Sequence, residues 1–151
     1  MNDLEITNKN WIQFGSDSYG RCILEYNVGE LKKPKNEEAD ISYILMIVRA
    51  AIEITNKNMG EKNHTANVRL KNLNLSVCPI KLTIKVIKIL QTELQNCVFD
   101  LNIYDVDQKY IFVWDGIKNF VDKDTLQKIT IYTTDGKKLN SVENLEKNLN
   151  N

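Results

Sequence analysis

Two kinds of hydrophobic pattern alternate along the chain, one typical of strands and the other of helices. Short runs of mixed aliphatic and aromatic residues that suit strands are "CILEYNV", "ANVRL", "VFDLNIY" and "KITIYTT". Between them, apolar residues recur at spacings of three and four, as they do on one face of a helix. Regular alternation of strands and helices indicates an α/β domain. We therefore predict a layered α/β/α sandwich whose mostly parallel, mixed sheet has about five strands.

The first two helical segments differ in how much of their surface is apolar. The segment "ISYILMIVRAAIEIT" is apolar on most sides, so we expect it to be packed between layers, with Asp40 placed to cap it. The segment after Pro79 has Ile80, Ile84 and Ile87 on one face and lysines on a wetter face. This spacing predicts a long amphipathic helix.

A third apolar stripe lies in the second half of the chain and predicts another helix. It consists of Tyr110, Val113, Trp114, Ile117 and Val121. After it, Asp122 and Asp124 offer starts for a further helical turn, and the dipeptide "DG" at residues 135–136 predicts a turn after the last strand.

Size and charge narrow the class of protein. The chain has 151 residues and is 42% apolar, so we expect a single domain over residues 1–151, with residues 1–10 as an N-terminal extension. Twenty basic residues balance 20 acidic ones, which gives no overall field to attract nucleic acid and excludes it as a partner. No apolar run is long enough to span a bilayer, and "MNDLEITNKN" lacks the regions of a signal peptide. We therefore expect a cytoplasmic protein.

Candidate catalytic and metal-binding residues are few. The three cysteines lie far apart without CxxC or Cys/His spacing, which indicates reduced, packed thiols and no metal site. The single histidine, His64, falls in a polar stretch with no nucleophile motif nearby, so we predict no enzyme activity. Asp100, Asp105 and Asp107 lack the Gly and the terminal Glu of a calcium loop. No cofactor is expected.

Four stretches, taken together, carry a resemblance to a known family. They are "GSDSYGRCILEYNVGEL", "RLKNLNLS", "ILQTELQN" and "WDGIKNFVDKDTLQKITIY". In order and spacing these stretches resemble the lipid-binding domain of the CRAL-TRIO family, over about Trp11 to Leu149. Arg69 and Asn72 stand where the family usually has Asp and Gly, Asn119 stands in the place of a Pro, and "DVDQK" replaces an Asn-Ala-Pro-like sequence.

The resemblance implies an apolar cavity between the sheet and a covering helix. A slot of this kind would bind an acyl chain with about 0.8 kcal/mol for each buried methylene. The implied cavity residues are Phe99, Leu101, Tyr110, Phe112, Val113, Trp114 and Ile117. Lys118 matches a basic residue that could meet a lipid headgroup as a point charge. An aromatic stripe at helical spacing is also typical of an ordinary core, and both interpretations stay open.

Two functions are therefore compatible with the sequence. The first is a non-catalytic module that holds or transfers a phospholipid or similar hydrophobic molecule, with peripheral membrane contact. The second is a degenerate module that kept the fold, lost the cargo, and serves protein interactions or a larger complex. Only about ten residues precede Trp11, so we expect no helical companion domain at this end. Fold ancestry alone does not decide between the two functions.

Overall fold

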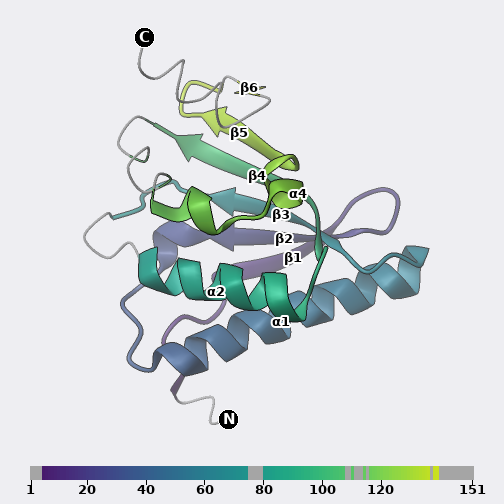
Figure 1. The fold of residues 1–151 in the computed structure, drawn as a ribbon, viewed down its shortest axis with the longest axis horizontal. Helices are drawn as coiled ribbons and strands as arrows, with labels where there is room; N and C mark the ends of the chain where they lie inside the picture. Colours follow the sequence, from purple (N-terminus) through teal and green to yellow (C-terminus); the bar gives the residue numbers. More distant parts are fainter. Residues whose placement is uncertain are drawn as a thin grey trace.

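The computed structural model describes residues 5–74, 80–107, 110, 114, 116–136 and 138–139. Within these residues the chain forms one six-stranded sheet, in which strands adjacent in sequence are also adjacent in space (Figure 1). Strands β2 to β5 run parallel, and the two outer strands run antiparallel to their neighbours. The strands are β1 Ile12–Ser16, β2 Cys22–Asn27, β3 His64–Arg69, β4 Val98–Val106, β5 Ile129–Thr133 and β6 Lys138–Leu139. The predicted α/β class and the mostly parallel, mixed sheet are confirmed.

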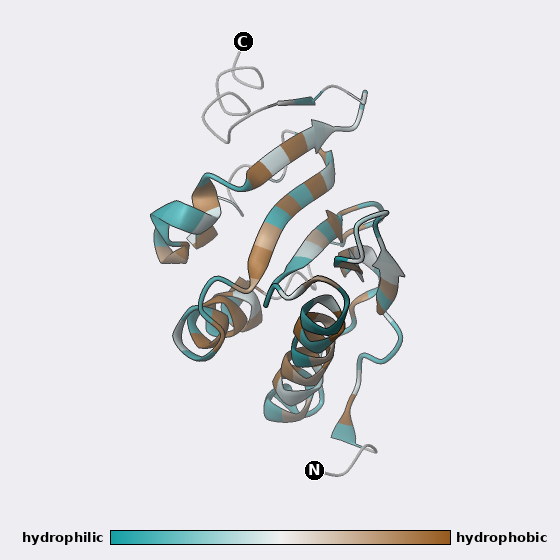
Figure 2. Ribbon diagram, turned by 90° about the vertical axis from the view of Figure 1, so that its right-hand side faces the viewer, coloured by the Kyte–Doolittle hydropathy of each residue, from teal (hydrophilic) through white to brown (hydrophobic). Residues whose placement is uncertain are grey.

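The described helices lie on one face of this sheet (Figures 1 and 2). They are α1 Glu37–Met59, α2 Ile80–Glu93 and α4 Lys123–Leu126, with short 3-10 helices η2 Val28–Glu30 and η5 Lys118–Phe120. The connections from β2 to β3, β3 to β4 and β4 to β5 each move one strand in the same direction. Right-handed crossovers in one direction place every connecting helix on the same face. The second helical layer expected for a sandwich is therefore not found among the described residues.

The opposite face of the sheet carries polar and aromatic side chains. Glu25 on β2 accepts hydrogen bonds from Asn67 Nδ2 at 2.9 Å and from Arg69 Nε at 2.8 Å on β3. The Arg69 guanidinium lies 4.3 Å from the ring centre of Tyr104, which stacks on Tyr132 with 4.5 Å between ring centroids. Because these groups bond and stack with one another, this face can remain without a helical cover.

The first helix begins earlier than the sequence predicts. The side chain of Asn36 accepts a hydrogen bond from the Ala39 amide at 3.2 Å and so caps α1, which starts at Glu37. Glu37 and Glu38 are favoured in this first turn because the helix dipole is positive at its amino end. The prediction that Asp40 is the cap is therefore wrong, since Asp40 lies inside the helix.

Asp40 instead anchors the N-terminal segment. Its buried carboxylate accepts hydrogen bonds from the amides of Thr7 at 2.8 Å and Asn8 at 3.3 Å, and from Asn8 Nδ2 at 2.7 Å. Asn8 also exchanges hydrogen bonds with the backbone of Lys32. The residues that the sequence suggests to be an extension are thus tied to the folded body from Thr7 onward.

Replacing Asp40 with alanine is expected to lower the free energy of unfolding by about 2 kcal/mol, because two buried donors and one half-buried donor lose their acceptor. The measurement is urea denaturation followed by circular dichroism. Glu38→Ala is the matched control, since Glu38 lies in the same helical turn but is exposed, and it should change stability by less than about 0.5 kcal/mol. Equal effects of the two substitutions would contradict the anchoring role.

The hydrophobic core is divided into two clusters. The first packs α1 against β1 and β2, and α2 adds partly buried residues to it. Its buried members are Trp11, Ile12, Cys22, Leu24, Ile44, Val48, Ala51 and Cys97. The second cluster lies between β4, β5 and α4, and apolar residues of β4 and β5 can be followed in Figure 2. Its members are Val106, Ile129 and Ile131, with Leu70, Leu101, Ile103, Trp114 and Leu126 packed against them.

His64 is a buried residue of β3. Its sequence neighbours suggest a polar loop, and that prediction is wrong. Its side chain is 1% exposed. Nδ1 lies 2.7 Å from the carbonyl oxygen of Cys97, and Nε2 lies 3.1 Å from the hydroxyl of Tyr26. A carbonyl oxygen can only accept, so Nδ1 carries the proton and donates it, which leaves Nε2 to accept from Tyr26. Burial lowers the pKa of His64 from 6.5 to about 4, so the ring is neutral at physiological pH.

Local signals elsewhere gave mixed results. The Asp122 side chain accepts from the Thr125 amide at 2.7 Å and caps α4, as its position predicts. The predicted turn after β5 is also confirmed, with Gly136 at φ 84° and its amide 2.9 Å from Thr133 O. Strand β1 was not predicted from the sequence. Only its first residue, Ile12, is buried, so apolar and polar residues do not alternate along it as they do in a half-buried strand.

Candidate functional site

A polar cavity of about 410 Å³ lies at the carboxyl ends of three parallel strands. In α/β sheets this edge is where ligands usually bind. Asn27 ends β2, Arg69 ends β3 and Asp105 is near the end of β4, so each strand contributes a polar side chain. The complete lining is Asn27, Gly29, Glu30, Arg69, Lys71, Asn72 and Asp105. The cavity thus combines two cationic and two anionic side chains with amide groups.

The cavity has its shape because two backbone segments approach each other closely. A Cβ atom added to Gly29 in η2 would lie 1.9 Å from the carbonyl oxygen of Lys71, so any side chain there would displace backbone. Asn72 and Asp105 have φ angles of 64° and 63°. Asn and Asp tolerate the left-handed region better than most residues. These conformations turn the chain sharply where β3 and β4 end.

The charges of the cavity are partly compensated by the open face of the sheet. Arg69 is held by Glu25 through Nε at 2.8 Å. Burial by itself would raise the pKa of Glu25, but the hydrogen bonds from Arg69 and Asn67 outweigh it and lower that pKa. The hydrogen bond to Glu25 in turn raises the pKa of Arg69. The Lys71 side chain lines the cavity and makes no hydrogen bond or ion pair with the described residues.

The apolar second cluster reaches the same edge through Leu70 and Val106. Leu70 belongs to this cluster, whereas its sequence neighbours Arg69 and Lys71 line the polar cavity. Val106 is likewise in the cluster, next to Asp105 in the cavity. Polar and apolar environments therefore meet at the ends of β3 and β4. An amphipathic molecule is the kind of ligand that uses both.

Three of the predicted cavity residues contact the second cluster or Leu70. Leu101 and Trp114 pack against the second cluster. Tyr110 is buried, and its hydroxyl donates a hydrogen bond to the carbonyl oxygen of Leu70 at 3.3 Å. The Nε1 atom of Trp114 is buried and has no hydrogen-bond partner among the described residues. A buried N–H group without a partner is rare in proteins and can be satisfied by an acceptor on a ligand.

The other predicted residues are placed differently. Ile117 is half-buried and Lys118 begins η5, whereas Phe112 and Val113 lie outside the described residues. Phe99 does not join Leu101 and Trp114. It is exposed at the amino end of β4, where the Arg21 guanidinium lies 3.5 Å from its ring centre.

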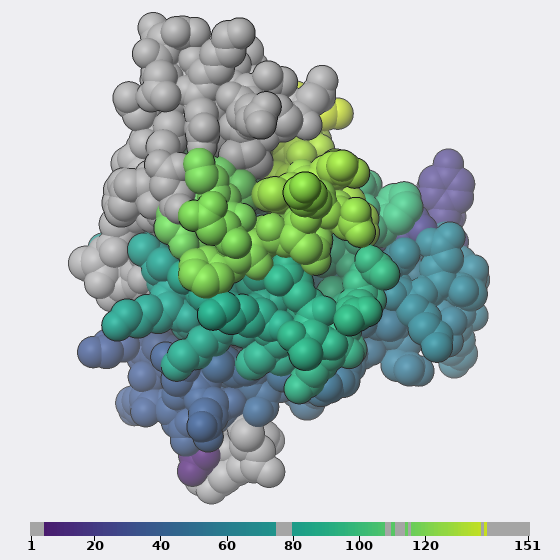
Figure 3. Space-filling model, viewed as in Figure 1, coloured from purple at the N-terminus to yellow at the C-terminus, as the bar shows by residue number. Residues whose placement is uncertain are grey.

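The segment that carries η5 and α4 is held on α2 by one glutamine. Gln91 Nε2 donates to the carbonyl oxygen of Phe120 at 2.9 Å, and Gln91 Oε1 accepts from the Asp122 amide at 2.8 Å. Lys88 lies 4.8 Å from the ring centre of Phe120. In the space-filling view α2 and this segment form one continuous surface (Figure 3). The cover over the second cluster is therefore attached through a few polar contacts.

The described residues offer little for catalysis. No group of three or more His, Cys, Asp or Glu side chains among them could hold a metal ion. Cys22 and Cys97 are free and buried, and burial raises the pKa of Cys97 to about 11, which keeps it a thiol. Both nitrogens of His64 are already bonded within the core. In the described part of the chain, no helix has the length and apolar character needed to cross a membrane.

Comparison with protein families gives a clear result. A family model described as the CRAL/TRIO domain matches residues 7–150. The chain belongs to the CRAL/TRIO domain family. Among solved structures, the crystal structure of Sfh5 is similar with a TM-score of 0.73 and 19% sequence identity, over 90% of this chain and 52% of that one. This chain therefore spans about half the length of the Sfh5 chain. The comparison with curated proteins gave no match.

The CRAL/TRIO membership clarifies one departure noted in the sequence. Asn72 stands where the family resemblance expects Gly, and its positive φ of 64° shows a backbone conformation that Gly adopts freely. Asparagine can take that conformation at modest cost, so the turn after β3 is kept despite the substitution. The departure at Asn72 was therefore a sequence signal for the cavity. The sequence did not show that Gly29, Lys71 and Asp105 line the same cavity.

Proposed function

We propose that this CRAL/TRIO domain is a non-catalytic module that binds a lipid and exchanges it with membranes. The observation that carries the proposal is the meeting of the apolar second cluster and the polar cavity at one edge of the sheet. The acyl part of the ligand would insert among Leu101, Ile103 and Trp114, beneath the segment that Gln91 attaches to α2. Each buried methylene would contribute about 0.8 kcal/mol of binding free energy.

The polar end of the lipid would lie toward the mixed-charge cavity. Lys71 and Arg69 suit a phosphate, and Asp105 and Glu30 suit a cationic or hydroxyl-bearing group. The contact between Lys118 and a lipid headgroup remains a prediction. The buried Nε1–H group of Trp114 supports a ligand that carries an acceptor, such as an ester carbonyl, near its apolar part.

Filling the proposed acyl site should weaken lipid uptake. Ile103→Trp adds volume on the face of β4 that packs into the second cluster, and we expect at least a tenfold loss of uptake, which corresponds to about 1.4 kcal/mol. The measurement is transfer of fluorescent phospholipid from vesicles, together with mass spectrometry of organic extracts of the purified protein. Tyr132→Trp is the matched control, because Tyr132 lies on the opposite face of the sheet and stacks on Tyr104.

Circular dichroism must first show that both variants are folded. Equal uptake by Ile103→Trp and the control would contradict the proposed site. Absence of any extractable lipid, together with no uptake by the unchanged protein, would contradict lipid binding itself.

The second candidate function is a protein-interaction module without cargo. It is favoured by the close packing of Trp114 and Leu126 on Ile129 and Ile131, as in an ordinary core. It is favoured also by the open sheet face, where Arg69 and the stacked tyrosines provide residue types that are enriched in protein interfaces. The absence of lipid in the experiment above would support this function.

A further inference from the structure

Strand β1 is an edge of the sheet with one side free of partners among the described residues. Its only strand neighbour there is β2. The Asn27 amide donates to the carbonyl oxygen of Trp11 at 2.9 Å, which marks Trp11 and Asn27 as a hydrogen-bonded pair. In an antiparallel ladder such pairs alternate, so the backbone groups of Gln13 and Gly15 point toward β2. Those of Phe14 and Ser16 therefore point away from the sheet.

This edge lacks the features by which proteins usually prevent pairing. Natural edge strands are protected by Lys, Pro, inward charges, bulges or short length. The sequence "IQFGS" of β1 contains no charge and no proline, and its register with β2 is regular over five residue pairs. Edge β1 is therefore able to accept another strand.

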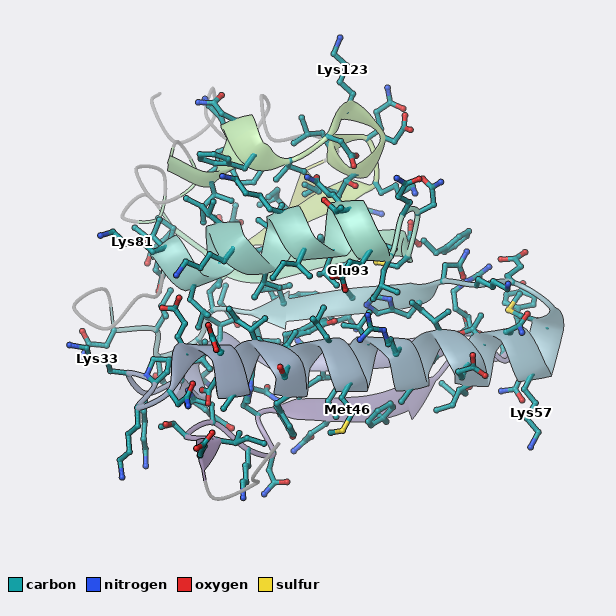
Figure 4. All side chains as sticks on the ribbon, turned by 60° about the horizontal axis from the view of Figure 1, so that its bottom comes forward. Lys33, Met46, Lys57, Lys81, Glu93 and Lys123 are labelled. Atoms are coloured by element: carbon teal, nitrogen blue, oxygen red, sulfur yellow. The ribbon has the colours of Figure 1, made fainter. Side chains whose placement is uncertain are left out.

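An apolar stripe on α1 continues this edge. Tyr43, Met46, Ala50 and Ile54 recur at helical spacing on one side of the helix. The Asn10 amide donates to the Tyr43 hydroxyl at 3.1 Å, so the stripe begins beside the residues that lead into β1. Met46 is 56% exposed and projects away from α2, as Figure 4 shows.

Phe14 adds an exposed apolar side chain on the strand itself. It is 47% exposed and pairs with Leu24, a core residue that packs with Val48 and Ala51 of α1. The phenyl ring is therefore level with the middle of α1. Large exposed apolar side chains that lie together indicate an interaction surface.

We propose that β1 pairs antiparallel with β1 of a second copy of this chain, which joins two sheets into one. A partner for this edge must offer unpaired backbone groups in the same spacing and an apolar surface beside them. The edge itself meets both conditions, and an antiparallel pair centred on Phe14 is related by a two-fold axis, the usual symmetry of homodimers. Because neither β1 nor the four α1 residues carry charge, two copies meet without repulsion between like charges.

The first test is the mass of the full chain in solution, measured by sedimentation velocity over a range of concentrations. The expected result is a species of twice the chain mass at high concentration. Amide hydrogen exchange adds the strand-level readout. Exchange at Phe14 and Ser16 should slow with concentration, whereas Gln13 and Gly15 should be protected at all concentrations because they already bond to β2.

Two variants test the surface from its strand and from its helix. Phe14→Pro removes the outward N–H group and the ring but leaves the bonds to β2, and Met46→Glu places a charge in the apolar stripe. Each should weaken association at least tenfold. Tyr19→Glu, at a residue of the same hairpin that is 78% exposed, should leave association unchanged. If Phe14→Pro does not fold, Met46→Glu still decides, because its site is on the surface.

A single-chain mass at every concentration would overturn the proposal. So would a dimer that survives Met46→Glu unchanged, or one whose formation leaves exchange at Phe14 and Ser16 unaffected. A dimer that is lost equally in Tyr19→Glu would also overturn it, since the contact would then involve the hairpin tip.

Discussion

Acidification from neutral pH to about pH 4 is expected to lower the free energy of unfolding by roughly 3 kcal/mol through His64 alone. In the unfolded chain the imidazole takes up a proton near its ordinary pKa of 6.5, whereas in the folded protein it does so only near pKa 4. The unfolded state therefore binds more protons in this interval, and stability falls as the pH falls. The contribution of His64 to the free energy of unfolding is fully present above pH 6.5.

The pKa of His64 is low because the ring is buried, and both nitrogens of the neutral ring already make hydrogen bonds. Nδ1–H donates to Cys97 and Nε2 accepts from Tyr26, so a second proton on Nε2 would break the hydrogen bond from the Tyr26 hydroxyl, which would have to turn and accept. The ring is also 1% exposed, and water cannot solvate the new charge. Protonation of the folded protein is therefore unfavourable at neutral pH.

The measurement is urea denaturation at a series of pH values, for the unchanged protein and for His64→Gln. The side-chain amide of glutamine offers an NH2 group as donor and a carbonyl oxygen as acceptor and does not titrate, so this variant should be less stable at neutral pH but should lose less stability on acidification. Carboxylate titration affects both proteins alike and cancels in the difference between them. Parallel pH profiles would show that His64 is not the group responsible.

Substitution of Gly29 by alanine is expected to lower the free energy of unfolding by roughly 3 kcal/mol. The added Cβ would meet the Lys71 carbonyl oxygen at 1.9 Å, and the atoms in conflict are backbone, which cannot rotate aside as a side chain can. Either η2 or the residues after β3 must move. Because Gly29 and Lys71 both line the polar cavity, lipid uptake should fall together with stability.

The matched control is Gly116→Ala. A Cβ at Gly116 meets no atom of the described residues within 4 Å, and its φ is not in the left-handed region. This substitution should be neutral or stabilising by about 0.5 kcal/mol, because alanine is the better helix former. Thermal denaturation of both variants is sufficient to compare them. If Gly29→Ala were as stable as Gly116→Ala, the expectation would be contradicted, because the backbone at Gly29 and Lys71 would then move apart at little cost.

The sequence predicted those elements whose signals are local. The apolar periods of α1 and α2 and the run "KITIYT" are strong enough to predict helices and a strand without knowledge of their neighbours. Asp122 was recognised as a cap because capping depends on residues within one turn. Asp40 shows the limit of this reasoning, since its real partners, Thr7 and Asn8, are more than 30 positions away in sequence.

The candidate site depended on information that no local pattern contains. Gly29 and Lys71 meet because β2 and β3 are adjacent and parallel, and only the sheet order shows this. In the alternating pattern of β4, Phe99 falls on the same side as Leu101. The register between β3 and β4 is irregular at Phe99, however, so the alternation does not continue through this residue. A strand period cannot reveal an inserted residue, so Phe99 was grouped with residues on the other side of the irregularity.

The division of the core gives the molecule two built-in fluorescent reporters. The only tryptophans are Trp11, inside the first cluster, and Trp114, packed against the second. Emission from single-tryptophan variants would follow the melting of each half of the interior separately. Coincident curves would mean that the β3–β4 ladder couples both halves into one cooperative unit, whereas separated curves would identify the half beneath α4 as an independently opening region.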